Sequence, residues 1–164
     1  MERKSMKMSV KFGGAVAAAA LVVSLGAAGV YAQDKAAIVK DRQETMKAQA
    51  AGLGEVKKYV EGNGDQKAAE AGVQKTLAAL KSAPSKFQPG TSLEDMPNVS
   101  WAKPDIWKDQ AKFEAAYKNA VAEVEKLDQA VKTGDKAKVQ AQFAETGKQG
   151  CGGCHTPFRQ AKPS

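Results

Sequence analysis

Apolar residues recur at intervals of three and four along most of the chain after residue 33, and this spacing predicts four helices. They are expected over residues 34–61, residues 65–82, residues 104 to about 131, and residues 136–158. The supporting stripes contain, in turn, Ile38, Met46, Leu53, Val56 and Val60; Val73, Leu77 and Leu80; Ile106, Phe113, Tyr117, Val121, Val124, Leu127 and Val131; and Val139, Phe143, Cys151, Cys154 and Phe158.

The links between these helices favour an antiparallel arrangement. Two of them, "EGNGD" and "KTGD", are short and rich in glycine, whereas residues 83–103 form one long segment with three prolines and a glycine. Pro104 suits the first turn of a helix, and Asp135 is a suitable N-cap for the helix that follows it. Two short links and one long one fit an all-α, antiparallel four-helix bundle in a single domain.

The N-terminal 32 residues have the pattern of a cleaved signal peptide. Four basic residues precede the apolar run from Ala15 to Val30, and "VYA" ends at Ala32, so the mature chain is expected to begin at Gln33. A retained membrane anchor is the alternative, but the run has 16 residues, fewer than the ~20 needed to span a bilayer. We therefore expect residues 33–164 to form a periplasmic protein that does not lie in a membrane.

Charge gives little indication of a polyanionic partner. The whole chain carries +7, but the mature part has 21 basic against 17 acidic residues, a net charge of +4. Lysines alternate with Asp and Glu along the chain without an arginine cluster, which is typical of solvated helix faces. Nucleic-acid binding is not expected.

The chemistry of the chain is concentrated in "GCGGCHTPFR" near its C-terminus, which contains both cysteines and the single histidine. Cys151 and Cys154 are three residues apart, so they share one face of a helix, and His155 follows directly. In this C-x-x-C-H pattern the two thiols attach covalently to the vinyl groups of a haem and the imidazole binds its iron. Gly152 and Gly153 let the ring edge approach the backbone closely.

Three other interpretations of the two cysteines are weaker. A four-ligand zinc site needs more Cys and His residues than the chain has. A thioredoxin-like dithiol is expected beside a βαβ pattern, which this helical chain lacks. A structural disulfide would give His155 no role. We therefore expect one covalent haem c, and its attachment outside the bacterial cytoplasm agrees with the export signal.

The motif's place in the last helix resembles the class II cytochromes c, the cytochrome c′ family. Further similar segments are "DRQETMK" in the first helix, "FQPGT" in the loop, "AKPDIW" at the start of the third helix, and Phe158 and Arg159 after the motif. The resemblance covers essentially the whole mature chain. It implies a four-helix bundle around a covalently bound haem, with His155 as proximal ligand, Arg42 near a haem propionate and Met46 at the distal face.

The residues themselves leave two of these roles open. Arg42 and Met46 are four apart and share a helix face, yet Arg42 fits an ordinary surface arginine and Met46 fits a core side chain. Because the chain has no second histidine, any protein ligand opposite His155 has to be a different residue type, and the mature chain has two methionines, Met46 and Met96. Met96, in the long loop beside Pro97, is a weaker candidate than Met46.

The family resemblance implies two possible functions, which differ in the sixth iron ligand. Ligation by Met46 would give a low-spin electron carrier that exchanges electrons with redox partner proteins, and the small residues near Met46 favour this reading. The alternative is a five-coordinate haem that binds NO or CO. No enzymatic activity is expected, since no nucleophile with a base and no distal acid–base pair is evident. A homodimer is possible.

Overall fold

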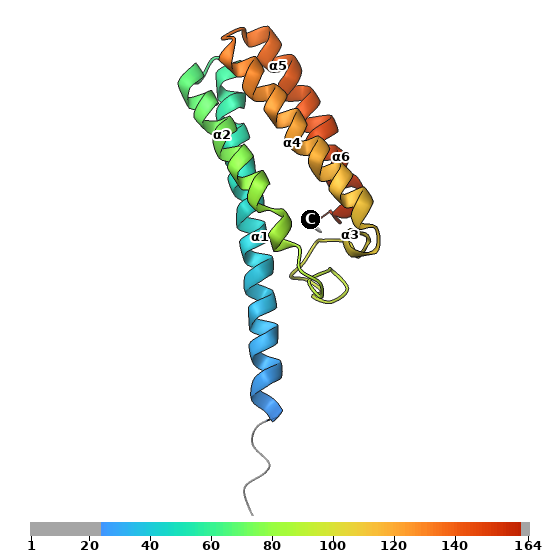
Figure 1. Cartoon of the computed structure of the whole chain (residues 1–164). Coiled ribbons are helices and arrows are strands. Elements are labelled where there is room, and N and C mark those ends of the chain that lie inside the picture. Colours follow the sequence, from blue (N-terminus) through green and yellow to red (C-terminus); the bar gives the residue numbers. More distant parts are fainter. Residues whose placement is uncertain (1–23, 162–164) are drawn as a thin grey trace, which may run out of the picture.

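A computed structural model describes the backbone of residues 24–161 and the side chains of residues 35–161. Four helical rods form the molecule: α1 (Ser24–Val60), α2 (Gln66–Ser82), α4 (Gln110–Lys132), and a rod that joins α5 (Lys136–Glu145), the π-helical segment η2 (Thr146–Gly152) and α6 (Gly153–Phe158). Neighbouring rods run in opposite directions (Figure 1). The predicted all-α four-helix bundle is confirmed, and no strand occurs among residues 24–161.

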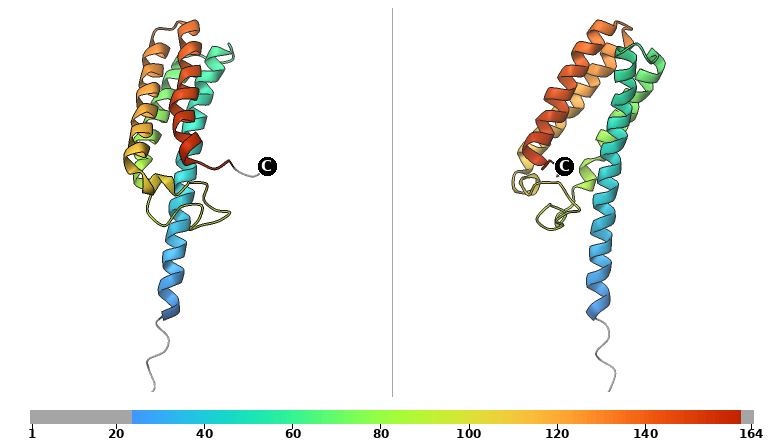
Figure 2. Two further views of the ribbon diagram at one scale, coloured as in Figure 1. Left: turned by 90° about the vertical axis from the view of Figure 1, so that its right-hand side faces the viewer. Right: turned by 180° about the vertical axis from the view of Figure 1, so that it is seen from behind.

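The expected signal peptide falls mainly outside the described residues. Residues 1–23 are not described, and α1 already begins at Ser24, before the expected cleavage point at Ala32. The N-terminal part of α1 extends beyond the other helices (Figure 2). Cleavage and a mature chain of residues 33–164 therefore stay predictions. Across residues 24–161, no helix combines the length and apolar character that crossing a membrane requires.

Aspartates at the helix starts satisfy backbone N–H groups that have no partner within the helix. Asp65 accepts from the N–H of Ala68 at the start of α2, and Asp135 accepts from those of Ala137 and Lys138 at the start of α5. The predicted cap at Asp135 is confirmed. These caps explain why the short links end where they do.

The third helix differs from the single helix expected after Pro104. Helix α3 (Asp105–Lys108) makes one turn, and Asp109 then leaves helical geometry, with φ −131° and ψ 71°. The Asp109 carboxylate accepts from the N–H of Lys112 and so starts α4 as a separate helix. The prediction of one continuous helix was wrong because an aspartate inside the expected helix acts as a cap.

The fourth rod also differs from the predicted regular helix, because η2 widens it to π-helical geometry just where the cysteine motif begins. Thr146 is fully buried and donates from Oγ1 to the carbonyl oxygen of Glu123 in α4, at 3.0 Å. Gly150 packs so closely on α4 that an added Cβ would lie 3.2 Å from Cβ of Glu123. The segment η2 is thereby held against α4 directly before the cysteines.

Two separate apolar clusters form the core. The larger one lies between α1, α2, α4 and α5 at the end of the bundle where the rods meet, and the smaller one lies near the long loop, where the α1–α2 pair diverges from the other two rods (Figure 1). The buried members of the larger cluster are Val56, Tyr59, Ala69, Val73, Leu77, Leu80, Ala120, Val124, Leu127, Val131 and Val139, and those of the smaller are Ala102, Ile106 and Phe158.

Helices α1 and α2 pack closely against each other at a pair of glycines, Gly52 and Gly72. A Cβ added to Gly52 would clash with the carbonyl oxygen of Gly72 and the hydroxyl of Thr76. The Thr76 hydroxyl donates to the carbonyl oxygens of both Gly72, at 2.9 Å, and Gln49, at 3.2 Å. This contact fixes the position of α1 relative to α2.

We expect Gly52→Ala to lower the free energy of unfolding by about 1–3 kcal/mol, because the added methyl group forces α1 away from α2. Gly54→Ala is the matched control, since its Cβ would meet nothing within 4 Å, and we expect it to raise stability by about 0.5–1 kcal/mol. Denaturant unfolding of the haem-loaded protein measures both values. Equal effects of the two substitutions would contradict the close packing of α1 on α2.

Candidate functional site

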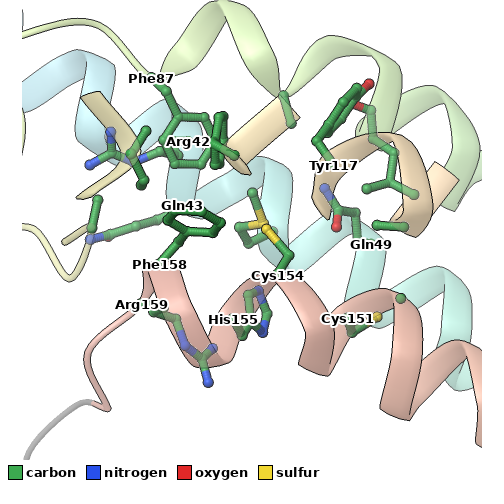
Figure 3. A pocket seen from close by; sticks show the side chains of 18 of the residues that line it. Arg42, Gln43, Gln49, Phe87, Tyr117, Cys151, Cys154, His155, Phe158 and Arg159 are labelled. Carbon is green, nitrogen blue, oxygen red and sulfur yellow. The ribbon is translucent and has the colours of Figure 1, made fainter. Parts of the chain in front are cut away.

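A cavity of about 400 Å³ lies between the two apolar clusters. Its walls come from α1, α2, the long loop, α4 and the rod that carries the cysteine motif (Figure 3). The volume falls in the range of roughly 300–1,000 Å³ that is common for ligand and cofactor pockets. All five residues singled out from the sequence line this one cavity: Arg42, Met46, Cys151, Cys154 and His155.

The cysteine motif is positioned by η2 and α6. Cys151 lies near the end of η2 and Cys154 lies in the first turn of α6, and both are partly buried with free thiols. The end of α6 is anchored by Phe158, which is buried and whose carbonyl oxygen accepts from the N–H of Lys103 at 2.9 Å. The N–H of Gln160 donates to the carbonyl oxygen of Trp101, also at 2.9 Å. The long loop thus holds α6 in place below the cavity.

Burial keeps the three functional side chains of the motif in their neutral forms. It raises the pKa of the Cys151 thiol, and burial together with the charge of Cys151 raises the pKa of Cys154. Burial and, to a smaller extent, the charge of Arg159 lower the pKa of His155. A neutral imidazole keeps a nitrogen lone pair, which is the form that binds a metal.

Arg42 is buried on α1 and connects this helix to the long loop. Nη1 donates to the carbonyl oxygen of Lys86 at 3.3 Å and to Oγ1 of Thr91 at 3.0 Å, while Nη2 donates to the Thr91 carbonyl oxygen at 3.0 Å and to Oγ of Ser100 at 2.9 Å. The guanidinium carbon lies 4.9 Å from the centroid of the Phe87 ring. Burial lowers the pKa of Arg42 to about 10.

Arg42 is therefore not the surface arginine that the sequence alone left possible. All its described acceptors are uncharged, and no carboxylate among residues 35–161 forms an ion pair with it. A buried cation without an anion is costly, so the cavity is suited to an occupant that brings its own negative charge beside Arg42. Contact with a haem propionate stays a prediction for this residue.

Met46 lies one helical turn after Arg42 on the α1 wall of the cavity. Met96 is in the long loop and does not line the cavity, so the ranking of Met46 ahead of Met96 agrees with their positions. A position on the cavity wall is compatible with both roles of Met46, as an iron ligand and as a packing side chain. Ligation of iron by Met46 therefore stays untested.

Gln49, Phe87 and Tyr117 are among the cavity residues that sequence reasoning did not assign to the site. Gln49 follows Met46 by three positions and Arg42 by seven, so helical periodicity was the available signal. Tyr117 was assigned to an apolar stripe, but its hydroxyl donates to the carbonyl oxygen of Leu80 at 3.0 Å while its ring lines the cavity. Phe87 reaches the cavity from an irregular segment, which periodicity does not predict.

A four-helix bundle with two thiols and an imidazole on one wall of an internal cavity defines a c-type haem protein whose haem lies between the helices. A family model described as Cytochrome C′ matches residues 37–159, which is most of the chain. The chain belongs to the cytochrome c′ family. Members of this family bind one covalently attached c-type haem, and the donor set and size of the cavity fit that group.

Two curated relatives are cytochromes c′. The chain is 46% identical to that of Rubrivivax gelatinosus over 74 residues, which are 45% of this chain and 54% of the relative. It is 34% identical to that of Alcaligenes xylosoxydans xylosoxydans over 128 residues, which are 76% of this chain and 94% of the relative.

Solved structures of the same two proteins share the fold. The cytochrome c′ of Rubrivivax gelatinosus matches with a TM-score of 0.65 and 35% identity, over 75% of this chain and 94% of that one. A variant of cytochrome c prime from Alcaligenes xylosoxidans in complex with nitric oxide matches with a TM-score of 0.67 and 28% identity, over 78% and 97%. A carbon monoxide-bound variant of that protein matches with a TM-score of 0.65 and 28% identity, over 76% and 94%.

We expect Cys151→Ala combined with Cys154→Ala to abolish covalent haem attachment, because no other cysteine is available in the chain. Mass spectrometry of exported protein should show one added haem in the parent and none in the double variant. Thr156→Ala, on the same helix at an exposed position, is the control that should keep the haem. A parent without added haem mass, made in a host with haem-attachment machinery, would contradict the assignment.

We expect Arg42→Leu to lower the free energy of unfolding by about 2–4 kcal/mol, because the long loop loses the four hydrogen bonds that Arg42 donates to Lys86, Thr91 and Ser100. Lys40→Leu removes an exposed charge from the same helix and should change stability by less than about 0.5 kcal/mol. Denaturant unfolding of the haem-loaded variants gives both values. Similar stability of the two variants would show that the Arg42 network does not hold the loop.

Proposed function

We propose that this chain is a five-coordinate cytochrome c′ that binds NO or CO. Cys151 and Cys154 hold the haem and His155 is its protein axial ligand. The comparisons favour this function over the electron carrier that the sequence suggested, because the solved relatives include nitric oxide and carbon monoxide complexes. These relatives align with this chain over almost their whole length.

The structural observation that carries the proposal is the composition of the α1 wall. When bound, the haem supplies an iron centre that takes a diatomic ligand at an open sixth position. Beyond Arg42 and Gln43, the α1 wall of the cavity is formed by Met46, Gln49 and Leu53. The long side chain of Lys47 also lines the cavity. This wall offers no imidazole, and the apolar side chains of Met46 and Leu53 restrict the space available to a ligand.

Electron transfer remains a second candidate because of one observation. Met46 is the only methionine that lines the cavity among the described residues, so its thioether is the one available protein ligand of the kind found in low-spin cytochromes. The two candidates differ in whether Met46 binds the iron or only packs against the haem face.

The remaining expectations belong to the same proposal. We expect the mature protein in the periplasm, since its export signal and covalent haem attachment both point there. Redox partner proteins and a homodimer stay predictions. The absence of an enzymatic activity also stays a prediction.

We expect the ferric parent protein to be high-spin and the reduced protein to bind CO. Met46→Ala should keep the spin state and accelerate CO binding roughly tenfold, because the removed side chain no longer crowds the ligand. Absorption and electron paramagnetic resonance spectra give the spin state, and stopped-flow mixing gives the rate. Met96→Ala, outside the cavity, is the matched control and should leave both unchanged.

A low-spin parent that becomes high-spin only in Met46→Ala would overturn the five-coordinate assignment. That result would instead establish thioether ligation and favour the electron carrier.

A further inference from the structure

The side-chain amide of Gln49 lacks a hydrogen-bond partner. Its nitrogen is shielded from solvent, and no acceptor lies within reach among the described residues. It is the only buried side-chain nitrogen or oxygen in the described part of the chain that has no hydrogen-bond partner. Buried polar groups of this kind are rare because leaving them unpaired costs free energy, so this one requires an explanation.

The backbone holds Gln49 in a fixed place on the cavity wall. Its carbonyl oxygen accepts from the Thr76 hydroxyl at 3.2 Å, at the close contact between α1 and α2. Its side chain lies between Tyr117 and Cys151, at the end of the cavity away from Arg42 (Figure 3). The Tyr117 hydroxyl already donates to the Leu80 carbonyl oxygen and forms no hydrogen bond with Gln49.

The Gln49 side chain lines the cavity, so an occupant of the cavity can supply the acceptor that the described residues do not provide. The carboxylates of a haem lie at the ring edge away from the two vinyl groups to which cysteines attach. Gln49 lies near Cys151, whereas Arg42, seven residues earlier and about 10 Å along the helix, is the residue suited to those carboxylates. Turning the terminal amide exchanges its nitrogen and oxygen without changing its shape, so the N–H groups can face the cavity.

We propose that the Gln49 amide donates a hydrogen bond to the small ligand held on the haem face that Met46 covers. This inference rests on the proposed function, because it needs a sixth position that takes an exogenous ligand. Gln49 and Met46 are three residues apart on α1 and therefore lie on the same face of the helix. Hydrogen-bond donors in the distal pocket help to decide which ligands a haem holds.

The chemical consequence is selectivity. A donor stabilises a bound ligand more when its outer atom carries more negative charge, so it favours NO over CO, whose outer oxygen accepts only a weak hydrogen bond. Met46 supplies steric crowding and Gln49 supplies polarity, so the two residues control different properties of the bound ligand.

The test measures the C–O stretching frequency of the reduced, CO-bound protein by infrared spectroscopy. Gln49→Leu removes the donor, and the frequency should shift to higher wavenumber because the outer oxygen loses its hydrogen bond. NO should dissociate about fivefold faster from the same variant, as expected for the loss of one neutral hydrogen bond. Gln49→Ala is a second variant that must show the same direction of both changes.

Gln74→Leu is the control. It replaces an exposed amide on α2 that does not line the cavity and whose nitrogen donates to the Asp128 carboxylate at 2.7 Å, so the frequency should stay that of the parent. Equal frequencies in the parent, Gln49→Leu and Gln49→Ala would overturn the role of Gln49 while CO binding itself still supports the proposed function. A reduced parent that binds neither CO nor NO would overturn the proposed function instead.

Discussion

The two apolar clusters of this bundle do not meet, and the cavity between them determines how the rest of the protein is built. A void of about 400 Å³ left unfilled would cost at most about 10 kcal/mol at roughly 24 cal/mol per Å³. That figure is comparable to the whole stability of a typical domain, about 5–15 kcal/mol. The haem that this family attaches covalently is therefore part of the core of the bundle as well as the group that performs its function.

The helix pairs diverge around the cavity, so contacts at its edge must hold α1, the long loop and α6 together. Arg42 joins α1 to the long loop through uncharged acceptors, and the rings of Phe87, Phe113 and Phe158 pack edge to face with centroids 5.0 and 5.3 Å apart. The loop then binds the end of α6 through two backbone hydrogen bonds, one from Lys103 to Phe158 and one from Gln160 to Trp101. Helix α1, the loop and α6 are thus connected around the cavity, although the helix pairs diverge there.

The sequence predicts most of this architecture because periodicity and caps are local properties. The four rods, the cap at Asp135 and the grouping of Cys151, Cys154 and His155 all follow from spacing along a helix. The break at Asp109 does not, because an aspartate inside an apolar stripe can either continue the helix or cap a new one, and the apolar spacing is the same in both cases. The π-helical turn of η2 does not either, because it is held by contacts with α4. Residues that close the cavity from the loop, such as Phe87, have no periodicity that could identify them.

The fold class does not determine which side chains α1 presents to the cavity, and these side chains set the chemistry of the site. Arg42, Met46 and Gln49 follow one another at intervals of four and three residues, so a single helix face presents a cation, a thioether and an amide to the same cavity. Because Gly52 and Gly72 fix α1 against α2 just beyond these residues, that face cannot rotate away from the cavity without losing this close contact. Under the proposed function, changes at Met46 and Gln49 are therefore expected to alter ligand choice with little effect on the bundle, whereas Arg42 also holds the long loop and cannot be changed independently of it.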